Sequence, residues 1–451
     1  MERQNHFSKT VYKIAVPVAF QSMLQSSFSV VDQIMIGQLG STGVAAVGLA
    51  GKFSSVFSVV VSAVAAVAGI MISQYMGQKN SGEVRRSFFI NLSIVAGIAA
   101  VFTALCLCCP EQIMSLYTKD AATCSMAAGY LWIMGWTFLP IAGSTMLAAM
   151  FRCMEKASLP LYAGIAAAVC NTILNYILIF GKFGITPMGV YGAGVATVLS
   201  QIANCVILYV LYHAFGVKGE IAGERPEGRF HWKQYGIMLF PVLACEFMWS
   251  LGENIYAGIY GRMGTQACAA MTLINPIQSL MIGALCGLSQ AAGIIIGKLL
   301  GKDETEEAYL DAKKLMLYGW GGSVVLSAIL LLTKAFYVNI YQVEPEVKML
   351  TSQILAAYAL IAPFKIQNMI LGGGILRSGG KTAYVMWIDL IGTWIFGVPL
   401  GLAAAFVWKL PIPYVYFILS LEECVRYGIS IFLFRKKGWM QQLQAAEQSA
   451  G

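Results

Sequence analysis

Charged residues are scarce in this chain of 451 residues. Asp, Glu, Lys and Arg make up 12% of it, whereas about 25% is usual in a soluble domain, and 58% of the residues are hydrophobic. So few charges cannot cover a water-soluble protein of this size, which excludes a disordered chain and argues against a soluble enzyme or a nucleic-acid-binding protein. The formal net charge of +8 would suit a nucleic-acid partner, but the positions of the basic residues give another explanation.

Metal-binding and catalytic patterns are missing from the sequence. The chain has 3 His and 11 Cys, and the cysteines show no spacing that is typical of a metal site. Most cysteines fall within apolar runs, where packing as a small hydrophobic residue is their usual role. The sequence shows no clustered His, Asp or Ser group of the kind that a membrane-embedded enzyme needs. We therefore expect neither enzyme activity nor a cofactor.

Short segments of alternating polarity, the signature of a membrane β-barrel, are also missing. Long apolar runs are present instead, for example at 94–109 and 321–333. A bilayer core about 30 Å thick needs about 20 apolar residues per spanning helix, and no backbone group can stay unpaired in lipid. The sequence therefore predicts an all-α integral membrane protein. Its twelve expected spans are 11–38, 43–75, 87–109, 126–149, 157–180, 188–215, 235–261, 267–298, 312–333, 351–376, 380–408 and 411–434.

Basic residues are distributed unevenly among the predicted loops. If the N-terminus is cytoplasmic, 21 of the 30 Lys and Arg residues lie in cytoplasmic segments or at the cytoplasmic ends of spans, 6 lie in outer segments and 3 lie deeper within spans. Such an excess is typical of cytoplasmic loops. We expect both termini in the cytoplasm. The N-terminal segment also lacks a small-residue cleavage site, which predicts an uncleaved first span. The net positive charge then reflects orientation, and we expect no nucleic-acid partner.

The chain contains an internal repeat. A shift of 224 residues aligns Pro17 with Pro241, Gly37 with Gly261, Gly40 with Gly264, Gly69 with Gly293, and Gly77 with Gly301. Each half holds six spans, so the halves have the same orientation and are related by an axis along the membrane normal. Repeats of this kind build transporters with a cavity between the halves that opens to each side in turn. We expect an N-lobe over 1–215, a cytoplasmic linker over 216–234 and a C-lobe over 235–451.

Ionisable residues within spans are costly and are usually functional. Eight of those in this sequence stand out: Asp32, Glu246, Glu253, Lys365, Asp389, Glu422, Glu423 and Arg426. Asp32 shares one face of the first span with Gln21 and Gln25. A buried carboxylate with amide partners can take up H⁺, or can bind Na⁺ through oxygen ligands. The alternative for these polar residues is hydrogen bonding between helices.

Further polar residues of the first half are spaced to join Asp32. Asn171 and Asn175 are four residues apart on the fifth span, and Thr197 precedes Gln201 by four on the sixth. Together with the first span they predict a polar pocket. Aromatic residues on the fourth span, Trp136 among them, suit contact with a hydrophobic cation, and for Trp132 anchoring at the membrane interface is an equal alternative.

In the second half we expect an ion pair between Glu246 and Lys365, because each charge alone is expensive in a span. Two unrelated charges that face the cavity are the alternative. For Asp389, Glu422 and Arg426 we expect a structural network, since Glu422 and Arg426 are four residues apart on one helix. We expect Glu423 to point elsewhere.

These features together resemble the multidrug and toxic compound extrusion (MATE) family of cation-coupled exporters, in its bacterial type. The resemblance covers about 10–440. It rests on Pro17, Asp32, Gly37 and Gly40, on the matching Pro241, Gly261 and Gly264, on Asn171 with Asn175, on YGAGVATVLSQ (191–201) and on LRSGGKT (376–382). It implies two six-helix bundles arranged as a V around a central cavity, and export of amphipathic or cationic compounds in exchange for H⁺ or Na⁺.

The resemblance also implies roles for single residues. Asp32 matches the family's first-span acid for cation coupling, and Tyr130, Asn171 and Asn175 match positions of the same N-lobe pocket. The chain departs from some relatives in two places. Proton-coupled relatives often carry Asp where this chain has Asn175. Others bind a cation in the C-lobe through acids at the positions of Trp249 and Ile366, which puts a site of that type in doubt here.

The sequence therefore predicts a secondary multidrug efflux antiporter that works by alternating access. We expect a multi-pass monomer in the bacterial cytoplasmic (inner) membrane, in contact with lipid, that needs only its coupling ion. Cation coupling is assigned to Asp32, Asn171, Asn175 and Tyr130, with Asp32 as the ligand if the ion is Na⁺. The substrate cavity is assigned to Gln21, Gln25, Trp136, Thr197, Gln201, Glu246 and Lys365. The alternatives are a passive channel and a flippase of lipid-linked or polysaccharide precursors, although a flippase should carry several arginines in its cavity and the spans hold only Arg426.

Overall fold

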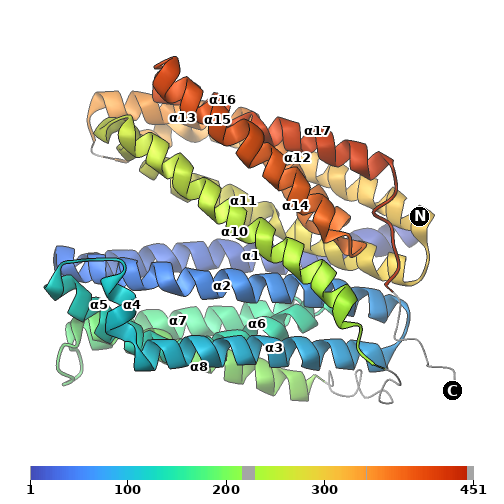
Figure 1. The fold of residues 1–451 in the computed structure, drawn as a ribbon, viewed down its shortest axis with the longest axis horizontal. Helices are drawn as coiled ribbons and strands as arrows, with labels where there is room; N and C mark the ends of the chain where they lie inside the picture. Colours follow the sequence, from blue (N-terminus) through green and yellow to red (C-terminus); the bar gives the residue numbers. More distant parts are fainter. Residues whose placement is uncertain (1, 216–228, 342, 444–451) are drawn as a thin grey trace. The chain divides into compact units, whose positions relative to one another are not determined.

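The computed structural model describes residues 2–215, 229–341 and 343–443, with side chains from Phe7 onward. Most of the predicted linker 216–234 lies outside the described residues. The described chain is built from helices, and strands do not occur in it (Figure 1). The first half contains α1 (Glu2–Gly37), α2 (Gly40–Gly77), α3 (Ser81–Cys108), α4 (Pro110–Ser115), α5 (Ala121–Met134), the 3₁₀ turn η1 (Gly135–Thr137), α6 (Phe138–Cys153), α7 (Ser158–Phe180) and α8 (Gly189–Ala214).

The second half begins with three long helices and continues through shorter pieces. Its elements are α10 (Trp232–Arg262), α11 (Thr265–Gly301), α12 (Thr305–Asn339), α13 (Pro345–Asn368), η2 (Met369–Leu376), α14 (Thr382–Leu390), η3 (Ile391–Gly397), α15 (Val398–Leu402), η4 (Ala403–Val407), α16 (Ile412–Ser420) and α17 (Glu422–Arg435). The segments η2, η3 and η4 are π-helical. They continue the neighbouring α-helices, so that 345–376 and 382–407 each form one long apolar helix.

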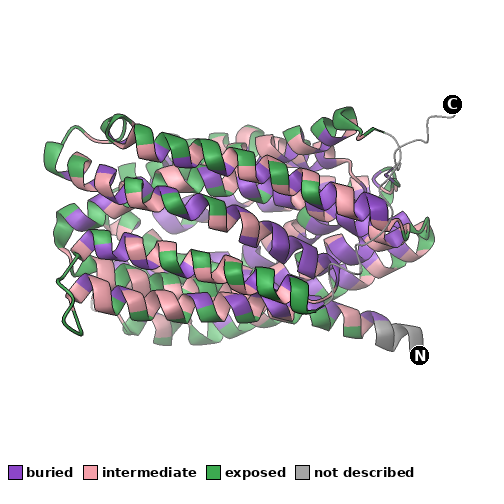
Figure 2. Cartoon of the chain, turned by 90° about the horizontal axis from the view of Figure 1, so that it is seen from below, coloured by how far each residue is buried: buried purple, intermediate pink, exposed green. Residues whose placement is uncertain are grey.

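The predicted membrane spans are confirmed. Among the described residues, eleven helices are long and apolar enough to cross a membrane. The twelfth expected span is formed by α16 and α17, which are separated by Leu421 alone. Many large apolar side chains on these helices are exposed, for example Leu332 at 84% and Phe240 at 71%. Figure 2 shows such exposed positions along the outer faces of the helices, as expected for surfaces that contact lipid rather than water.

The internal repeat is also confirmed by the helix boundaries. The last residues of α2 and α11 are 224 positions apart, and so are the first residues of α3 and α12. Gly40 and Gly264, which precede or begin the second helix of each half, both have a positive φ, at 84° and 121°. Lys79 and Asp303 share left-handed backbone conformations as well, with φ of 57° and 63°. Equal spacing of both helix ends and turns shows that the two halves repeat one structural plan.

The ends of the helices follow local sequence signals. The Asn80 side chain accepts a hydrogen bond from the Glu83 backbone N–H at 3.0 Å and caps α3. Asp120 caps α5 in the same way through Thr123, whose backbone N–H and hydroxyl donate to its carboxylate. These two hydrogen bonds hold the pKa of the Asp120 carboxyl below its usual range. Gly181 ends α7 with a φ of 67°, which a residue with a side chain rarely adopts.

The described chain divides into two compact units. One contains the residues up to Ala19, Ser73–Lys79 and the chain from 229 onward, and the other contains Phe20–Ile72 and Asn80 through 215. The helix α1 therefore passes from one unit to the other two residues after Pro17. A proline removes a backbone hydrogen bond and makes a helix easy to bend at that point.

Two glycines bring the end of α2 against α11 within the first of these units. A Cβ at Gly77 would overlap the carbonyl oxygen of Lys298, and a Cβ at Gly301 would overlap that of Gln74. The contact is symmetric in the repeat, because both pairs of positions are 224 apart. The C-terminal segment fixes this region: the Gln74 side chain donates to Ser378 O at 2.6 Å and accepts from the Leu443 N–H at 2.7 Å.

Candidate functional site

Asp32 contacts Asn175, one of the amide residues expected near it. Asn175 on α7 donates from Nδ2 to Oδ1 of Asp32 on α1 at 2.9 Å, and to Oδ1 of Asn171 at 3.1 Å. Asn171 and Asn175 lie one turn apart on α7, so both side chains leave the same helix face. The spacing in the sequence therefore identified a real cluster of polar side chains.

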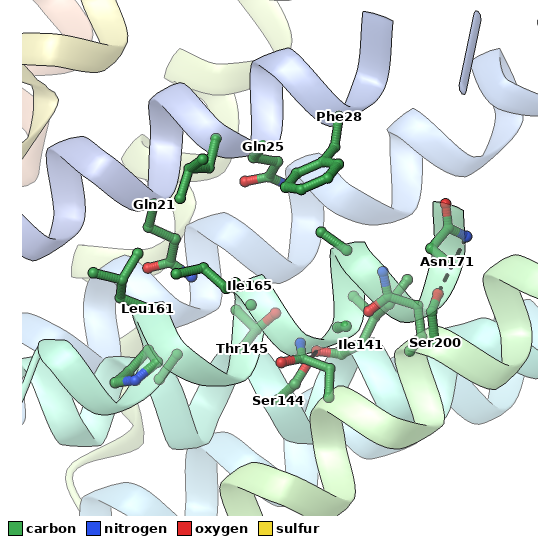
Figure 3. A pocket seen from close by; sticks show the side chains of 18 of the residues that line it. Gln21, Gln25, Phe28, Ile141, Ser144, Thr145, Leu161, Ile165, Asn171 and Ser200 are labelled. Carbon is green, nitrogen blue, oxygen red and sulfur yellow. Dashed lines mark hydrogen bonds between the residues drawn. The ribbon is translucent and has the colours of Figure 1, made fainter. Parts of the chain in front are cut away.

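Two orientations of the Asn171 amide give the cluster different hydrogen bonds. In one, Nδ2 donates to Ser200 Oγ at 3.3 Å, as drawn in Figure 3. In the other, the amide nitrogen lies 3.0 and 3.1 Å from the two carboxylate oxygens of Asp32. The second orientation gives Asp32 donors from both asparagines, which favours its ionised form. The first places the amide oxygen toward Asp32, where it can accept a hydrogen bond from the carboxyl when that group is protonated.

Asn175 also presents an oxygen without a partner. The residue is 2% exposed, and its Oδ1 has no hydrogen-bond donor among the described residues. An unsatisfied buried amide oxygen costs about 1–3 kcal/mol, so such an atom calls for a ligand. The Asp32 carboxylate and the Asn171 amide lie beside it. The three side chains carry carboxylate and amide oxygens, the donors that a hard cation such as Na⁺ prefers, and in this structure Asn175 faces Asp32 with its amide nitrogen.

Tyr130 lies near Asp32 but outside the lining of the neighbouring cavity. It is buried on α5, and its hydroxyl is close enough to Asp32 for an electrostatic interaction. The tyrosine ring packs against α8, where a Cβ at Gly194 would lie 3.3 Å from its carbons. Tyr130 does not line the neighbouring cavity. Its position fits a role in holding the cluster rather than contact with a substrate.

A cavity of about 500 Å³ opens next to Asp32, within the unit that contains Phe20–Ile72. The predicted residues Gln21, Gln25, Thr197 and Gln201 all line it, as does Asn171. Figure 3 shows Gln21, Gln25 and Asn171 around this space. They come from α1, α7 and α8, so three separate segments of the sequence contribute to one space. The polar pocket expected in the first half is therefore present.

Sequence reasoning missed the fourth wall of this cavity, which is α6. Ser144, Thr145 and Arg152 line the cavity from this helix. Thr145 and Arg152 are seven residues, or about two helical turns, apart and so share one helix face, which is the signal that could have found them. Trp136, expected at the substrate cavity, is 49% exposed and does not line this one.

Glu246 and Lys365 do not form the expected ion pair. Glu246 on α10 pairs with Arg377, with Nη1 3.5 Å from Oε1, and Lys365 on α13 pairs with Glu423, with Nζ 4.0 Å from Oε1. The expectation was wrong because each residue has another opposite charge nearby. Arg377 lies in a predicted loop but is largely buried after η2, and Glu423 points toward Lys365 rather than elsewhere.

The expected network around Arg426 is confirmed and is larger than predicted. The Arg426 guanidinium lies 3.8 Å from Asp389, 3.7 Å from Glu422 and 3.8 Å from Glu423. Tyr256 donates to Glu422 at 2.5 Å. All three carboxylates face one buried cation, so charges that are each costly in a membrane offset one another.

Glycines in the π-helix η3 make room for this network. A Cβ at Gly392 would overlap the Arg426 side chain, and one at Gly397 would overlap the Glu422 carboxylate and the Tyr256 hydroxyl. π-Helical turns occur frequently at functional or strained positions of helices. Here the wide turn and its two glycines accommodate buried charged side chains.

Comparison with known proteins matches most of this chain to one family and to relatives named for multidrug resistance. The family model described as MatE matches residues 17–177 and 241–403, two segments whose starts are 224 residues apart. The "Probable multidrug resistance protein NorM" of Brucella suis biovar 1 is 26% identical, over 87% of this chain and 85% of that protein. The "Multidrug resistance protein MdtK" of Edwardsiella ictaluri is 22% identical, over 89% of this chain and 88% of that protein.

Solved structures share the fold. The Vibrio cholerae MATE transporter VcmN in its bent form superimposes with a TM-score of 0.81 at 16% identity, over 97% of this chain and 98% of that chain. A MOP superfamily transporter from Pyrococcus furiosus gives a TM-score of 0.84 at 16% identity, over 95% of both chains. These TM-scores establish a shared architecture. At identities this low the comparison does not extend to the chemistry of the site, which rests on the residues described above.

Proposed function

Since this chain belongs to the MatE family, we propose that it exports small amphipathic or cationic compounds in exchange for inward-moving H⁺ or Na⁺. Curated relatives of similar length carry names that denote multidrug resistance, which supports efflux of several small molecules. Export is driven by the ion gradient through alternating access. The chain acts as a monomer in the bacterial inner membrane, with both termini in the cytoplasm.

The observation that carries the coupling role is the partly buried group of Asp32, Asn171 and Asn175. Among the described residues Asp32 is the only acid that lines the cavity, and the unpartnered Asn175 oxygen lies beside it. The amides stabilise the ionised carboxylate, and H⁺ or Na⁺ neutralises it. Each form of Asp32 thus has favourable partners, as a reversible ion-binding group requires.

Coupling follows if the loaded and empty forms of this group favour different conformations. A ligand shifts a conformational equilibrium only by its difference in affinity between the states. Asp32 lies on α1, and the same helix contains Pro17 just before it passes into the other unit. We propose that neutralising Asp32 changes the packing of α1 near Pro17, so that substrate and ion stabilise different states.

For Na⁺, the ligands are the carboxylate of Asp32 and the amide oxygens of Asn175 and Asn171. For H⁺, Asp32 alone carries the proton, and the protonated carboxyl donates a hydrogen bond to the Asn171 oxygen in one amide orientation. Both ions use the same carboxylate, so one substitution tests the coupling role before the ion is known.

The test is efflux of a fluorescent cation from proteoliposomes, with Na⁺ and pH gradients imposed separately. We expect one gradient to drive efflux by the wild-type protein, and Asp32→Asn to abolish that efflux with normal amounts of folded protein. Glu111→Gln is the control, because Glu111 is an exposed acid in the short helix α4. Unchanged efflux by Asp32→Asn would refute the coupling role, and efflux indifferent to both gradients would support a passive channel.

A further inference from the structure

The cavity beside Asp32 points to a narrower class of substrate: we propose that it binds hydroxylated monoamines, compounds with one ammonium group and several hydroxyls. The inference rests on the proposed function, because it assigns a ligand to the cavity of the same exporter. It is carried by the hydrogen-bonding groups of the lining, by the scarcity of aromatic rings there and by the two charges.

The lining is rich in hydrogen-bond acceptors. Three of its hydroxyls already donate to carbonyls of their own helices: Ser58 to Ser54 O at 3.2 Å, Ser144 to Ile141 O at 3.1 Å and Thr197 to Ala193 O at 2.9 Å. Their oxygens therefore retain lone pairs for a ligand. A space lined by such acceptors favours a ligand that brings its own donors, as hydroxyl and ammonium groups do.

Asn204 adds an unpartnered acceptor. This residue lines the cavity from α8, and its Oδ1 is buried without a hydrogen-bond donor in the described part of the chain. Leaving an amide oxygen unsatisfied costs about 1–3 kcal/mol, which a ligand hydroxyl would recover. Gln201, one turn earlier, and Gln25 on α1 also line the cavity and can both donate and accept.

Aromatic surface is scarce in the same lining. Phe28 is its one aromatic residue, and Met, Trp and Tyr are missing from the described residues that form it. A flat hydrophobic cation is held mainly by aromatic faces and by adaptable side chains such as Met. The cavity offers one ring for such contacts beside several aliphatic residues, so its hydrogen-bonding groups are what would select one ligand over another.

The charges of the lining limit the ligand to one ammonium group. Among the described lining residues, Asp32 supplies one negative charge and Arg152 on α6 is the other charged residue. A second ammonium group would find no second acid in this described lining. The volume of about 500 Å³ is within the usual range of about 300–1,000 Å³ for small-molecule sites. An amino sugar or an amino alditol fits these limits.

The test compares four compounds by calorimetry on the full chain purified in detergent. Glucamine has one amine and five hydroxyls, hexylamine keeps the amine and carbon number without hydroxyls, sorbitol keeps the hydroxyls without the amine, and ethidium is a flat aromatic cation. We expect glucamine to bind at least about tenfold more tightly than each of the others. Equal or tighter binding of hexylamine or ethidium would overturn the proposal, and so would absence of glucamine binding.

Variants at one position assign the binding to this cavity. Asn204→Leu removes the unpartnered oxygen and should weaken glucamine binding by about tenfold, whereas Asn204→Asp keeps an acceptor and should retain binding even if the Leu variant folds poorly. Asn254→Leu is the matched control, since Asn254 is an exposed amide on α10. Equal glucamine affinity in Asn204→Leu and wild type would contradict the assignment.

Failure of this proposal can be distinguished from failure of the exporter proposal. If a gradient drives efflux of the fluorescent cation and Asp32→Asn abolishes it, ion-coupled export stands whatever the glucamine result. Without glucamine binding in that case, only the substrate class falls. If neither gradient drives efflux of the fluorescent cation or of glucamine, the exporter proposal itself falls.

Discussion

At the scale of single residues, this protein concentrates its chemistry in a few side chains that a membrane tolerates poorly. Asp32 is held by two asparagines, and Arg426 gathers three carboxylates. The two groups differ in one respect. Arg426 satisfies its carboxylates with a permanent positive charge, whereas Asp32 has neutral amide partners and so remains able to exchange an ion. This difference supports the coupling role that we propose for the first group and a structural role for the second.

Asn175→Leu distinguishes the two candidate ions. The change removes the donor 2.9 Å from Asp32 and the unpartnered oxygen beside it. If Na⁺ is coupled, we expect the Na⁺ concentration for half-maximal efflux to rise by about 10-fold or more, since a hydrogen bond or ligand to a charged group is worth about 1.5–3 kcal/mol. If H⁺ is coupled, the ionised carboxylate loses a donor and holds its proton more tightly, so the pH for half-maximal efflux should rise. Identical ion dependence in Asn175→Leu and wild type would contradict a coupling role for Asn175.

The site could be predicted from the sequence where its residues share one helix. The spacing of Asn171 and Asn175, and of Gln21, Gln25 and Asp32, placed each set on a common face, and the structure brings these faces together. The pairing of Glu246 and Lys365 was wrong because it needed knowledge of which helices are neighbours. Helical periodicity gives the direction of a side chain and does not give its partner on another helix.

At the scale of elements, glycine positions decide which helices approach closely. The boundaries of α2 and α3 recur in α11 and α12, and they follow from glycines and caps visible in the sequence. The π-helical segments η2, η3 and η4 could not be predicted, since a π turn inserts one residue into the hydrogen-bond ladder without a distinctive local sequence. The role of η3 follows only from the packing of side chains, because Arg426 lies against Gly392 where a Cβ would overlap it.

Gly77→Ala tests the close contact between α2 and α11. The added Cβ would overlap the backbone carbonyl of Lys298, which no side-chain rotation can relieve. We expect a loss of about 1–3 kcal/mol in stability, read as a lower midpoint of thermal unfolding in detergent. Gly69→Ala on the same helix is the control, because a Cβ there meets no atom within 4 Å and alanine favours a helix. Equal destabilisation by both changes would mean that the contact at Gly77 is not the cause.

At the scale of the whole molecule, the compact units do not simply follow the two sequence repeats. The unit that contains the second repeat also includes the start of α1 and the end of α2. The C-terminal segment joins these parts, since Gln74 and Gln78 at the end of α2 bind Leu443. Sequence periodicity revealed the repeat but not this arrangement, because contacts between residues more than 360 positions apart arise only from tertiary packing.

Trp439→Ala tests whether the C-terminal segment stabilises the fold. Trp439 is fully buried, stacks on Phe434 and donates from its indole N–H to the Phe434 carbonyl at 3.1 Å. Truncation of a buried tryptophan costs about 3–5 kcal/mol, and here it also loosens the segment that holds Leu443 on Gln74. We expect a clear fall in the midpoint of thermal unfolding in detergent, whereas Trp408→Ala, at a tryptophan that is 53% exposed, should change it little. If both variants unfold at the wild-type temperature, the C-terminal segment contributes nothing to stability, and closure of α2 against α11 must depend on the glycine contact alone.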